Sequence, residues 1–335
     1  MISEKSHSVA YRAHTNIALI KYWGKRNKEL FLPVTSSLSL TLDQFYTDTA
    51  LSWNDQTPTD TFTLNGQVQD ANAVQKVSRF IDMFRESSGI NHSVHINSVN
   101  HVPTAAGLAS SASAYAALAA ASNDLFQTNL SHQQLSTYAR QGSGSASRSL
   151  FGGFVRWNKG VGDDSASSYA EQIDEAGWDI GMLVVVINHE EKKISSRVGM
   201  EHTIQTSPFY KLWPETVEAD LEQMLAAIKE RDFQTIGEIT EHNAMKMHAT
   251  VIASKPSINY WEPKSLVAMD IVRDLREAGI DCYFTMDAGP NVKVLCRLSQ
   301  ANLIKEAFLS AFNEDQLIIT GPGRQAYKLA DGEFK

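Results

Sequence analysis

Pro103-Thr104-Ala105-Ala106-Gly107-Leu108-Ala109-Ser110-Ser111-Ala112-Ser113 is the stretch of this sequence that decides most about its fold. A strand-like segment, 93–99, precedes it, and the alanine-rich segment 112–126 after it is predicted to be a helix. Gly107 permits a close backbone approach, and the hydroxyl and free amide groups at the helix start can bind phosphate oxygens, aided by the helix dipole. A small-residue helix cap packed closely on a sheet would contain similar residues. The stretch therefore predicts a strand–loop–helix unit whose loop is a candidate phosphate site.

Both halves of the chain contain strand-like and helix-like segments, which indicates an α+β protein. The predicted strands cover 9–23, 36–42, 93–99, 178–187, 281–286, 292–298 and 316–320, with a hairpin at 53–66 that turns at Asn65-Gly66. The predicted helices cover 71–88, 112–126, 131–142, 214–230, 233–249, 263–278 and 300–312. The segment 161–177 is rich in Gly, Ser, Asp and Glu and marks a domain joint. We therefore predict two domains, 1–176 and 177–335.

Composition excludes several classes of protein. A net charge of −8 over 335 residues opposes binding to nucleic acid or to an anionic membrane. Residues 1–8 lack the apolar segment of a signal peptide, and the apolar runs 114–121 and 182–187 are too short to span a bilayer. Cys282 and Cys296 are expected to be buried thiols in a reducing cytoplasm, and no His/Cys spacing indicates a metal held by the protein.

A second candidate site follows the first predicted strand. Lys21-Tyr22-Trp23-Gly24-Lys25-Arg26 places three cations beside two aromatic rings, with Asn16 upstream. Such cations can bind a diphosphate while the rings exclude water. A solvated, charged turn after a strand is the alternative interpretation.

A third cluster is Gly142-Ser143-Gly144-Ser145-Ala146-Ser147-Arg148-Ser149. Its small residues can expose backbone amides, and the planar guanidinium of Arg148 can bind a carboxylate through two parallel hydrogen bonds. A flexible Gly/Ser connection would look similar.

Two shorter strings complete the candidates. Ser195-Ser196-Arg197 follows the lysine pair Lys192-Lys193, which is typical of a solvated surface as well as of a phosphate site. Met286-Asp287-Ala288-Gly289-Pro290-Asn291 lies at the tip of the predicted C-terminal hairpin, where an Asp is most often a turn cap.

Taken together, these strings resemble the GHMP-kinase superfamily and, within it, the diphosphomevalonate decarboxylases. The stretch from Pro103 matches the superfamily's phosphate loop, P-x-x-x-G-L-x-S-S-A-S. The strings N-I-A-x-x-K-Y-W-G-K from Asn16, S-G-S-A-x-R from Ser143 and M-D-A-G-P-N from Met286 match the decarboxylases. The resemblance implies a two-domain GHMP-kinase fold, with an N-terminal ribosomal-protein-like α/β domain, a C-terminal ferredoxin-like α+β domain and the active site in the cleft between them.

The resemblance also implies roles for individual residues. ATP would be bound by Pro103, Ala105, Ala106, Gly107, Leu108, Ala109, Ser110, Ser111, Ser113 and Lys192. The substrate would be bound by Lys21, Tyr22, Trp23, Gly24, Lys25, Arg79, Ser143, Gly144, Ser145, Ala146, Ser147, Arg148, Ser196 and Arg197. Catalysis would rest on Asp287, as the catalytic carboxylate, with Arg148, Ser196 and Asn16.

The activity implied is ATP-dependent decarboxylation of mevalonate diphosphate, with Mg²⁺ arriving on ATP rather than in a protein-built metal site. A cytoplasmic homodimer is expected, with these small molecules as its ligands. The alternatives are a small-molecule kinase of the same fold, a decarboxylase that accepts the monophosphate, and a non-catalytic ligand sensor. The strings around Lys21 and Arg148 argue against a simple kinase, and the presence of Asp287 argues against a sensor.

Overall fold

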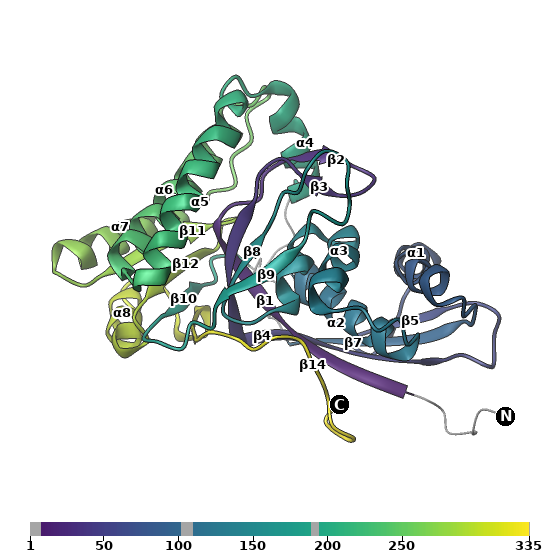
Figure 1. Ribbon diagram of the computed structural model, residues 1–335. Helices are drawn as coiled ribbons and strands as arrows, with labels where there is room; N and C mark the ends of the chain where they lie inside the picture. The colour runs from purple at the N-terminus through teal and green to yellow at the C-terminus, as the bar shows by residue number, and fades with distance from the viewer. Residues whose placement is uncertain (1–7, 102–109, 189–193, 335) are drawn as a thin grey trace.

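The computed structural model describes residues 8–101, 110–188 and 194–334. Its larger sheet has the strand order β14-β1-β4-β7-β5-β6, and β8 and β9 extend it from β4 (Figure 1). Its strands pair antiparallel except β5 and β7, which are parallel. The strands are β1 (Ser8–Ile20), β4 (Ser37–Trp53), β5 (Thr61–Leu64), β6 (Gln67–Val68), β7 (Val94–His101), β8 (Phe154–Trp157), β9 (Ala170–Asp174) and β14 (Tyr327–Lys328).

Helices α1 (Ala71–Ser88), α2 (Ser110–Leu125) and α3 (His132–Gly142) lie together beside this sheet, and α2 packs on β1 and β4 (Figure 1). The small side chains of α2 permit this close packing, because its alanines are buried on several faces against the sheet, α3 and the 3₁₀ helix η1 (Gly144–Leu150). This packing fixes the N-terminus of α2, where the predicted phosphate loop ends.

The smaller sheet is antiparallel, with the order β11-β12-β10-β13. Alternate residues of β10 face opposite helix layers: Met182 and Val184 pack in the core with α5 and α6, and Leu183 and Val185 pack in the core with α7 and α8. These elements are β10 (Gly181–Val185), β11 (Cys282–Met286), β12 (Val292–Cys296), β13 (Leu317–Thr320), α5 (Trp213–Glu230), α6 (Phe233–Ile252), α7 (Pro263–Glu277) and α8 (Ala301–Phe308). The two-part α+β fold predicted from the sequence is confirmed.

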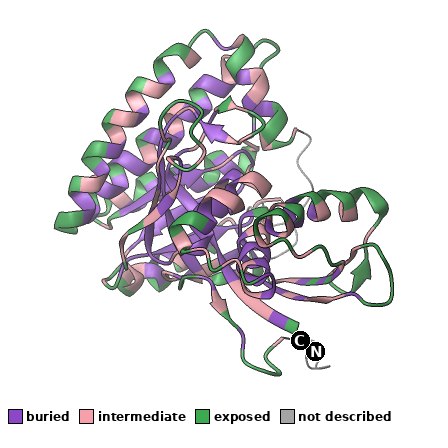
Figure 2. Ribbon diagram, turned by 45° about the vertical axis from the view of Figure 1, so that its right-hand side comes forward, coloured by how far each residue is buried: buried purple, intermediate pink, exposed green. Residues whose placement is uncertain are grey.

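Strand β1 links the two halves. The strand pairs with β4 along its length in the larger sheet, and Ile17, Leu19 and Ile20 near its C-terminal end also join a core shared with α5 and α6. Figure 2 shows in purple the buried residues at the centre of the molecule. The strand therefore delivers the next residue, Lys21, into the junction between the halves. The short hairpin of β2 (Lys25–Asn27) and β3 (Leu32–Pro33) follows directly.

Local signals predicted several element ends correctly. Helix α1 ends at Gly89, which takes a left-handed conformation, and Ser131 caps α3 in a reciprocal capping box with Gln134. Asn65 and Gly66 both have positive φ in the turn between β5 and β6.

Other predictions were wrong. The strand predicted at 36–42 continues to Trp53, so the hairpin predicted from residue 53 begins only at Thr61. Buried polar side chains such as Thr47, Asp48 and Thr49 break the apolar pattern by which strands are recognised. The domain joint predicted at 161–177 stays a prediction, and part of that segment forms strand β9. The alternative of a flexible Gly/Ser connection at 142–149 is not found, because most of that segment is the buried helix η1. Helix α4 (Ser196–Thr206) was not predicted.

Cys282 and Cys296 are free and buried, as predicted, and burial raises the pKa of both thiols to about 12. In the part of the chain described, no helix is both long and apolar enough to cross a membrane.

Candidate active site

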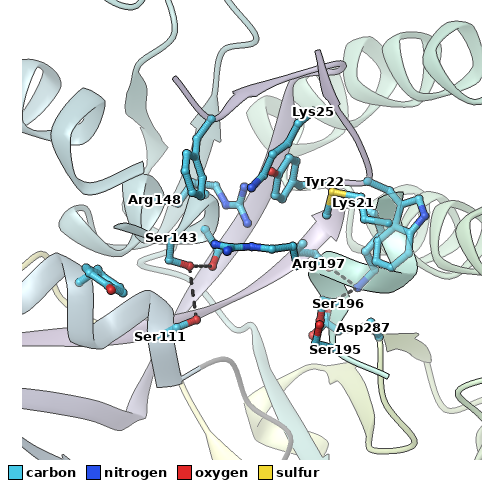
Figure 3. Close-up of a pocket in the computed structure, with 18 of the residues that line it drawn as sticks. Lys21, Tyr22, Lys25, Ser111, Ser143, Arg148, Ser195, Ser196, Arg197 and Asp287 are labelled. Atoms are coloured by element: carbon cyan, nitrogen blue, oxygen red, sulfur yellow. Dashed lines mark hydrogen bonds and ion pairs between the residues drawn. The ribbon is translucent and has the colours of Figure 1, made fainter. Parts of the chain in front are cut away.

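A cavity of about 550 Å³ lies where the two halves of the protein meet (Figure 3). It is lined from the first half by residues after β1, in α1, α2 and η1, and from the second half by residues in α4, α6 and the turn after β11. The predicted site residues that line it are Asn16, Lys21, Tyr22, Trp23, Lys25, Ser111, Ser143, Gly144, Ser145, Arg148, Ser196, Arg197 and Asp287. Residues more than 250 positions apart in the sequence thus share one cavity.

Asp287 lies between two buried lysines. Its Oδ1 is 2.9 Å from Nζ of Lys21, and its Oδ2 is 3.4 Å from Nζ of Lys293. Both lysine side chains are 2% exposed, whereas the Asp287 side chain is 32% exposed and reaches the cavity. Burial lowers the pKa of Lys21, although the attraction of Asp287 opposes this shift. The arrangement presents a carboxylate, rather than an ammonium group, to a ligand.

Lys21 is fixed from the second half of the protein. Its backbone N–H donates to Oδ1 of Asn243 on α6 at 2.8 Å, and Nδ2 of Asn243 donates to Asp220 of α5 at 2.7 Å. The Nζ of Lys21 also donates to the carbonyl of Ala18 at 2.8 Å. These bonds hold the end of β1 in register with the turn that carries Asp287.

Arg148 is buried at the opposite wall of the cavity. Its Nε donates to Ser39 at 3.0 Å and to Asn16 at 3.3 Å, and Nη1 donates to Ser37 at 2.5 Å. These three acceptors are neutral, so they orient the guanidinium without cancelling its charge. Burial lowers the pKa of Arg148 to about 10, which leaves it cationic at neutral pH. A buried cation held in this way is suited to an anionic ligand.

Asn16 acts through its neighbours. Its Nδ2 donates to Oγ of Ser149 at 2.8 Å and to the carbonyl of Ser145 at 3.0 Å, which joins β1 to η1. The predicted catalytic residue Asn16 is therefore placed to orient Arg148.

Three serine hydroxyls form a row along the cavity. Oγ of Ser111 is 3.3 Å from Oγ of Ser143, which is 3.3 Å from Oγ of Ser145 (Figure 3). Ser111 is in the first turn of α2, where free N–H groups and the helix dipole favour anions. The row connects this helix terminus with η1.

Two further cations, Lys25 and Arg197, lie beside the ring of Phe31. The Nζ of Lys25 lies 3.6 Å from the centroid of the Phe31 ring, and Cζ of Arg197 lies 5.5 Å from it. The pKa of Lys25 is lowered to about 8, first by burial and then by repulsion from Arg197. A polyanion bound between these two cations would relieve their repulsion.

The chain is related to proteins of known activity. It is 37% identical over 315 residues to the diphosphomevalonate decarboxylase of Homo sapiens, and this alignment covers 88% of this chain and 78% of the relative. It is 38% identical over 303 residues to the diphosphomevalonate decarboxylase of Danio rerio, and that alignment covers 85% of this chain and 75% of the relative. A family model described as a diphosphomevalonate decarboxylase-like N-terminal domain matches residues 13–170, and one described as a mevalonate 5-diphosphate decarboxylase C-terminal domain matches residues 182–329. The chain belongs to the diphosphomevalonate decarboxylase family.

Solved structures of the family have the same fold. The mevalonate diphosphate decarboxylase from Staphylococcus aureus is 45% identical with a TM-score of 0.93, and the alignment covers 98% of this chain and 99% of that one. A structure named "MDDEF in complex with MVAPP, AMPPCP and Magnesium" is 47% identical with a TM-score of 0.91, covering 97% and 99%. The domain boundary at 176/177 stays a prediction, although the two family models leave only residues 171–181 between them.

Some residues predicted from the sequence motifs lie outside the cavity lining. Ser113 and Ser147 are fully buried. The Ser113 hydroxyl is hydrogen-bonded to the hydroxyls of Thr15 and Thr47, and the Ser147 hydroxyl donates to the carbonyl of Gly144. Ala146 is likewise buried in the core beneath η1. These three residues are placed to shape the loop rather than to touch a ligand.

Gly24 and Arg79 also lie outside the lining. Gly24 has a φ of +130°, and a Cβ there would lie 1.8 Å from the hydroxyl of Tyr210, so this position requires glycine. Arg79 is exposed on α1, while Lys76 from the same helix does line the cavity. The predicted ligands Pro103, Ala105, Ala106, Gly107, Leu108, Ala109 and Lys192 lie outside the described residues.

Sequence reasoning missed several residues of the site. Ser37 and Ser39 hold Arg148, Phe31 contacts Lys25 and Arg197 through its ring, and Lys293 contacts Asp287. Lys293 had one usable signal, since it is a charged residue between apolar residues near the start of the strand predicted at 292–298, of which Val292–Cys296 forms β12. Phe31 had no such signal.

We expect His248 to make the native state acid-sensitive. This histidine is buried behind the Lys21–Asp287 pair, and burial, followed by repulsion from Lys21, lowers its pKa from 6.5 to about 4. Below about pH 6.5 the His248 side chain is protonated in the unfolded chain but stays neutral in the native state. The free energy of unfolding therefore falls as the pH falls toward 4, by on the order of 3 kcal/mol. Urea unfolding of wild type and His248→Gln between these pH values should show a shallower pH dependence for the variant; equal slopes would contradict the assignment.

Proposed function

We propose that this protein catalyses the ATP-dependent decarboxylation of mevalonate diphosphate to isopentenyl diphosphate, with release of ADP, phosphate and carbon dioxide. One observation carries the proposal: a single cavity holds a lysine-bound carboxylate, Asp287, together with a buried arginine, Arg148, whose hydrogen-bond acceptors are all neutral. A phosphoryl transfer needs the first group, and a substrate that carries a carboxylate needs the second.

The diphosphate end of the substrate suits the part of the cavity around Phe31. Lys25 and Arg197 come from opposite halves of the protein and converge there, and Ser196 lines the same cavity. The two cations beside Phe31, together with Arg148 in the same cavity, match a molecule that carries both a diphosphate and a carboxylate.

ATP suits the side of the cavity at the N-terminus of α2. A smaller pocket of about 250 Å³ adjoins the main cavity there and shares Lys76, Ser111 and Tyr115 with it. Its other walls are mainly apolar, including Phe62, Leu64, Val77, Ile96 and Leu118, as a nucleotide base requires. With the base in this pocket, the phosphates would lie along the helix N-terminus and Ser111.

Magnesium fits the donor chemistry of the cavity. Magnesium would arrive bound to the phosphate oxygens of ATP, and the hydroxyl of Ser111 in the first turn of α2 is a hard oxygen donor of the kind that Mg²⁺ accepts. Held there, the ion would neutralise negative charge on the phosphates.

Asp287 would act first. A tertiary hydroxyl is a poor leaving group, so it has to be converted into a phosphate ester before it can depart. The Asp287 carboxylate would accept a hydrogen bond from the 3-hydroxyl and orient its oxygen toward the γ-phosphorus of ATP. It would take up the proton as the new P–O bond forms and the bond from the γ-phosphorus to the bridging oxygen breaks, releasing ADP. Lys21 would hold this carboxylate in place, and its positive charge would favour the ionised form.

Arg148 would act in the second step. When the new phosphate leaves with its bonding electrons, positive charge develops at the tertiary carbon. The electrons of the adjacent C–C bond then form the double bond, and the carboxylate leaves as carbon dioxide. A guanidinium fixed by Ser37, Ser39 and Asn16 would hold that carboxylate aligned with the breaking C–O bond until it leaves.

An assay that follows ADP and carbon dioxide together tests the proposal. Mevalonate diphosphate, the monophosphate and mevalonate are supplied separately, each with ATP and magnesium. We expect one carbon dioxide per ADP with the diphosphate and little with the others. ADP without carbon dioxide would identify a kinase, preference for the monophosphate would identify the other decarboxylase, and ligand binding without turnover would identify a sensor.

We further infer a cytoplasmic homodimer. Two buried free thiols are compatible with a reducing compartment, and exposed apolar side chains such as Leu266 on α7 and Leu303 on α8 could be covered by a second subunit. Sedimentation equilibrium at micromolar concentration would test the dimer, and a monomer would contradict it.

A further inference from the structure

Lys293 is a buried cation that the family motifs do not include. It lies on β12, opposite Thr285 of β11, and its residue is 1% exposed. Its Nζ lies 3.4 Å from Oδ2 of Asp287 and donates to the carbonyl of Asn291 at 3.2 Å. Burying an ammonium group costs several kcal/mol unless it is paired, so its position requires an explanation.

Stabilisation of the turn alone does not explain it. Asn291 already fixes the turn between β11 and β12, because its Oδ1 accepts hydrogen bonds from the backbone N–H groups of Ile187 at 2.7 Å and Asn188 at 3.1 Å. A neutral side chain could donate to the carbonyl of Asn291 as well as Lys293 does. What only a cation adds is its attraction for Asp287.

Lys21 and Lys293 hold the two oxygens of Asp287 separately. Lys21 approaches Oδ1 from the end of β1 in the larger sheet, and Lys293 approaches Oδ2 from β12 in the smaller sheet. Contacts on both oxygens restrict rotation of the carboxylate about its Cβ–Cγ bond. They therefore determine which lone pair faces the cavity.

The charges around Asp287 are unbalanced. Three buried cations, Lys21, Lys293 and Arg148, interact with this one carboxylate, and His248, which also faces the group, is neutral at physiological pH. The surplus of positive charge favours an ionised Asp287. It also favours a polyanionic substrate and the negative charge that moves during phosphoryl transfer.

We propose that Lys293 is a positioning residue of the reaction, which together with Lys21 holds the Asp287 carboxylate ionised and in the orientation that the substrate hydroxyl requires. The proposal rests on the proposed function, because it assigns Lys293 to the same chemical step. It adds a residue that acts on the base without lining the substrate cavity.

The test compares Lys293→Gln and Lys293→Met with wild type. Glutamine keeps a donor for the carbonyl of Asn291 but removes the charge, and methionine removes both while nearly conserving length. We expect both variants to fold, because replacing a buried charge by a neutral group of similar volume is often well tolerated. Arg276→Met is the control, since Arg276 forms an ion pair with Glu241 at the opposite end of β11.

The measurements are kcat and KM, from carbon dioxide release between about pH 4 and about pH 9, with melting temperatures measured at each pH. For both Lys293 variants we expect kcat to fall by roughly 10- to 100-fold and KM to change by less than about threefold. The acid limb of the kcat profile should move to higher pH, because the carboxylate has lost a cation that favours its charged form. Arg276→Met should lower the melting temperature without moving the acid limb.

Three results would overturn the proposal: a kcat within about threefold of wild type, an unmoved acid limb, or a loss of activity that follows melting temperature as in the control. The proposed function can fail separately. If wild type releases no carbon dioxide, both fall; if wild type is active and the Lys293 variants are unaffected, only the role of Lys293 is wrong.

Discussion

Asp287→Asn should reduce kcat by more than about 10³-fold, because the amide cannot accept the proton of the substrate hydroxyl. Asparagine keeps the shape of the side chain and an oxygen that can face Lys21, so the local structure should be retained. Removing the negative charge leaves Lys21 and Lys293 buried without their counter-charge, so we also expect some loss of thermal stability. Steady-state carbon dioxide release and a melting curve measure the two effects.

Asp43→Asn provides a matched control for this substitution. Asp43 accepts hydrogen bonds from Oγ1 of Thr320 at 2.8 Å and from the backbone N–H of Gly321 at 3.0 Å, and it does not line the cavity. This variant should lose stability but keep kcat near the wild-type value. If Asp287→Asn lowers kcat by less than about a hundredfold, or no more than Asp43→Asn does, then Asp287 is a turn cap and the catalytic assignment is wrong.

Arg148→Lys should be severely impaired although the charge is conserved. Lysine cannot donate simultaneously to Ser37 and Ser39 and to a substrate carboxylate with the geometry of a planar guanidinium. We expect kcat/KM to fall by more than about 10²-fold, since positioning of the carboxylate is lost along with the hydrogen bonds. Binding of ATP alone, measured by calorimetry, should change little, because Ser111 and the 250 Å³ pocket are not altered.

Arg156→Lys tests whether any arginine in this region would give the same result. Arg156 lies on β8 and forms an ion pair with Glu171, with about a third of its side chain exposed. Its replacement by lysine should leave kcat/KM within about twofold of wild type, as for most exposed ion pairs. Near-normal kinetics of Arg148→Lys would exclude Arg148 as the residue that holds the carboxylate.

The sequence predicted most helices and the two-part fold, because their signals are local. Helix α1 has an apolar face formed by Val77, Phe80, Ile81 and Phe84, and Gly89 ends it. The prediction for the long strand β4 ended too early, because the second half of the strand buries Thr47, Asp48 and Thr49. These side chains form hydrogen bonds with residues that are distant in the sequence. Such polar residues look like a loop until their partners are known.

The residues of the candidate site differ in the same way, according to whether their signal in the sequence is local. Residues in contiguous motifs, such as Lys21 and Arg148, were found from the sequence and converge in one cavity. The residues that hold them were not found. Asn243 supports Lys21 from 222 positions away, and Ser39 supports Arg148 from 109 positions away. No local pattern encodes those contacts, because each depends on how the two halves of the chain pack together.

The order of the two chemical steps tests the central claim most directly. A substrate analogue with fluorines near the tertiary carbon should still accept the phosphoryl group but resist the developing positive charge. Rapid quench of the wild-type protein with this analogue and γ-labelled ATP should trap a 3-phosphorylated species that retains its carboxylate. Carbon dioxide released at the normal rate from mevalonate diphosphate with a non-hydrolysable ATP analogue would contradict the account.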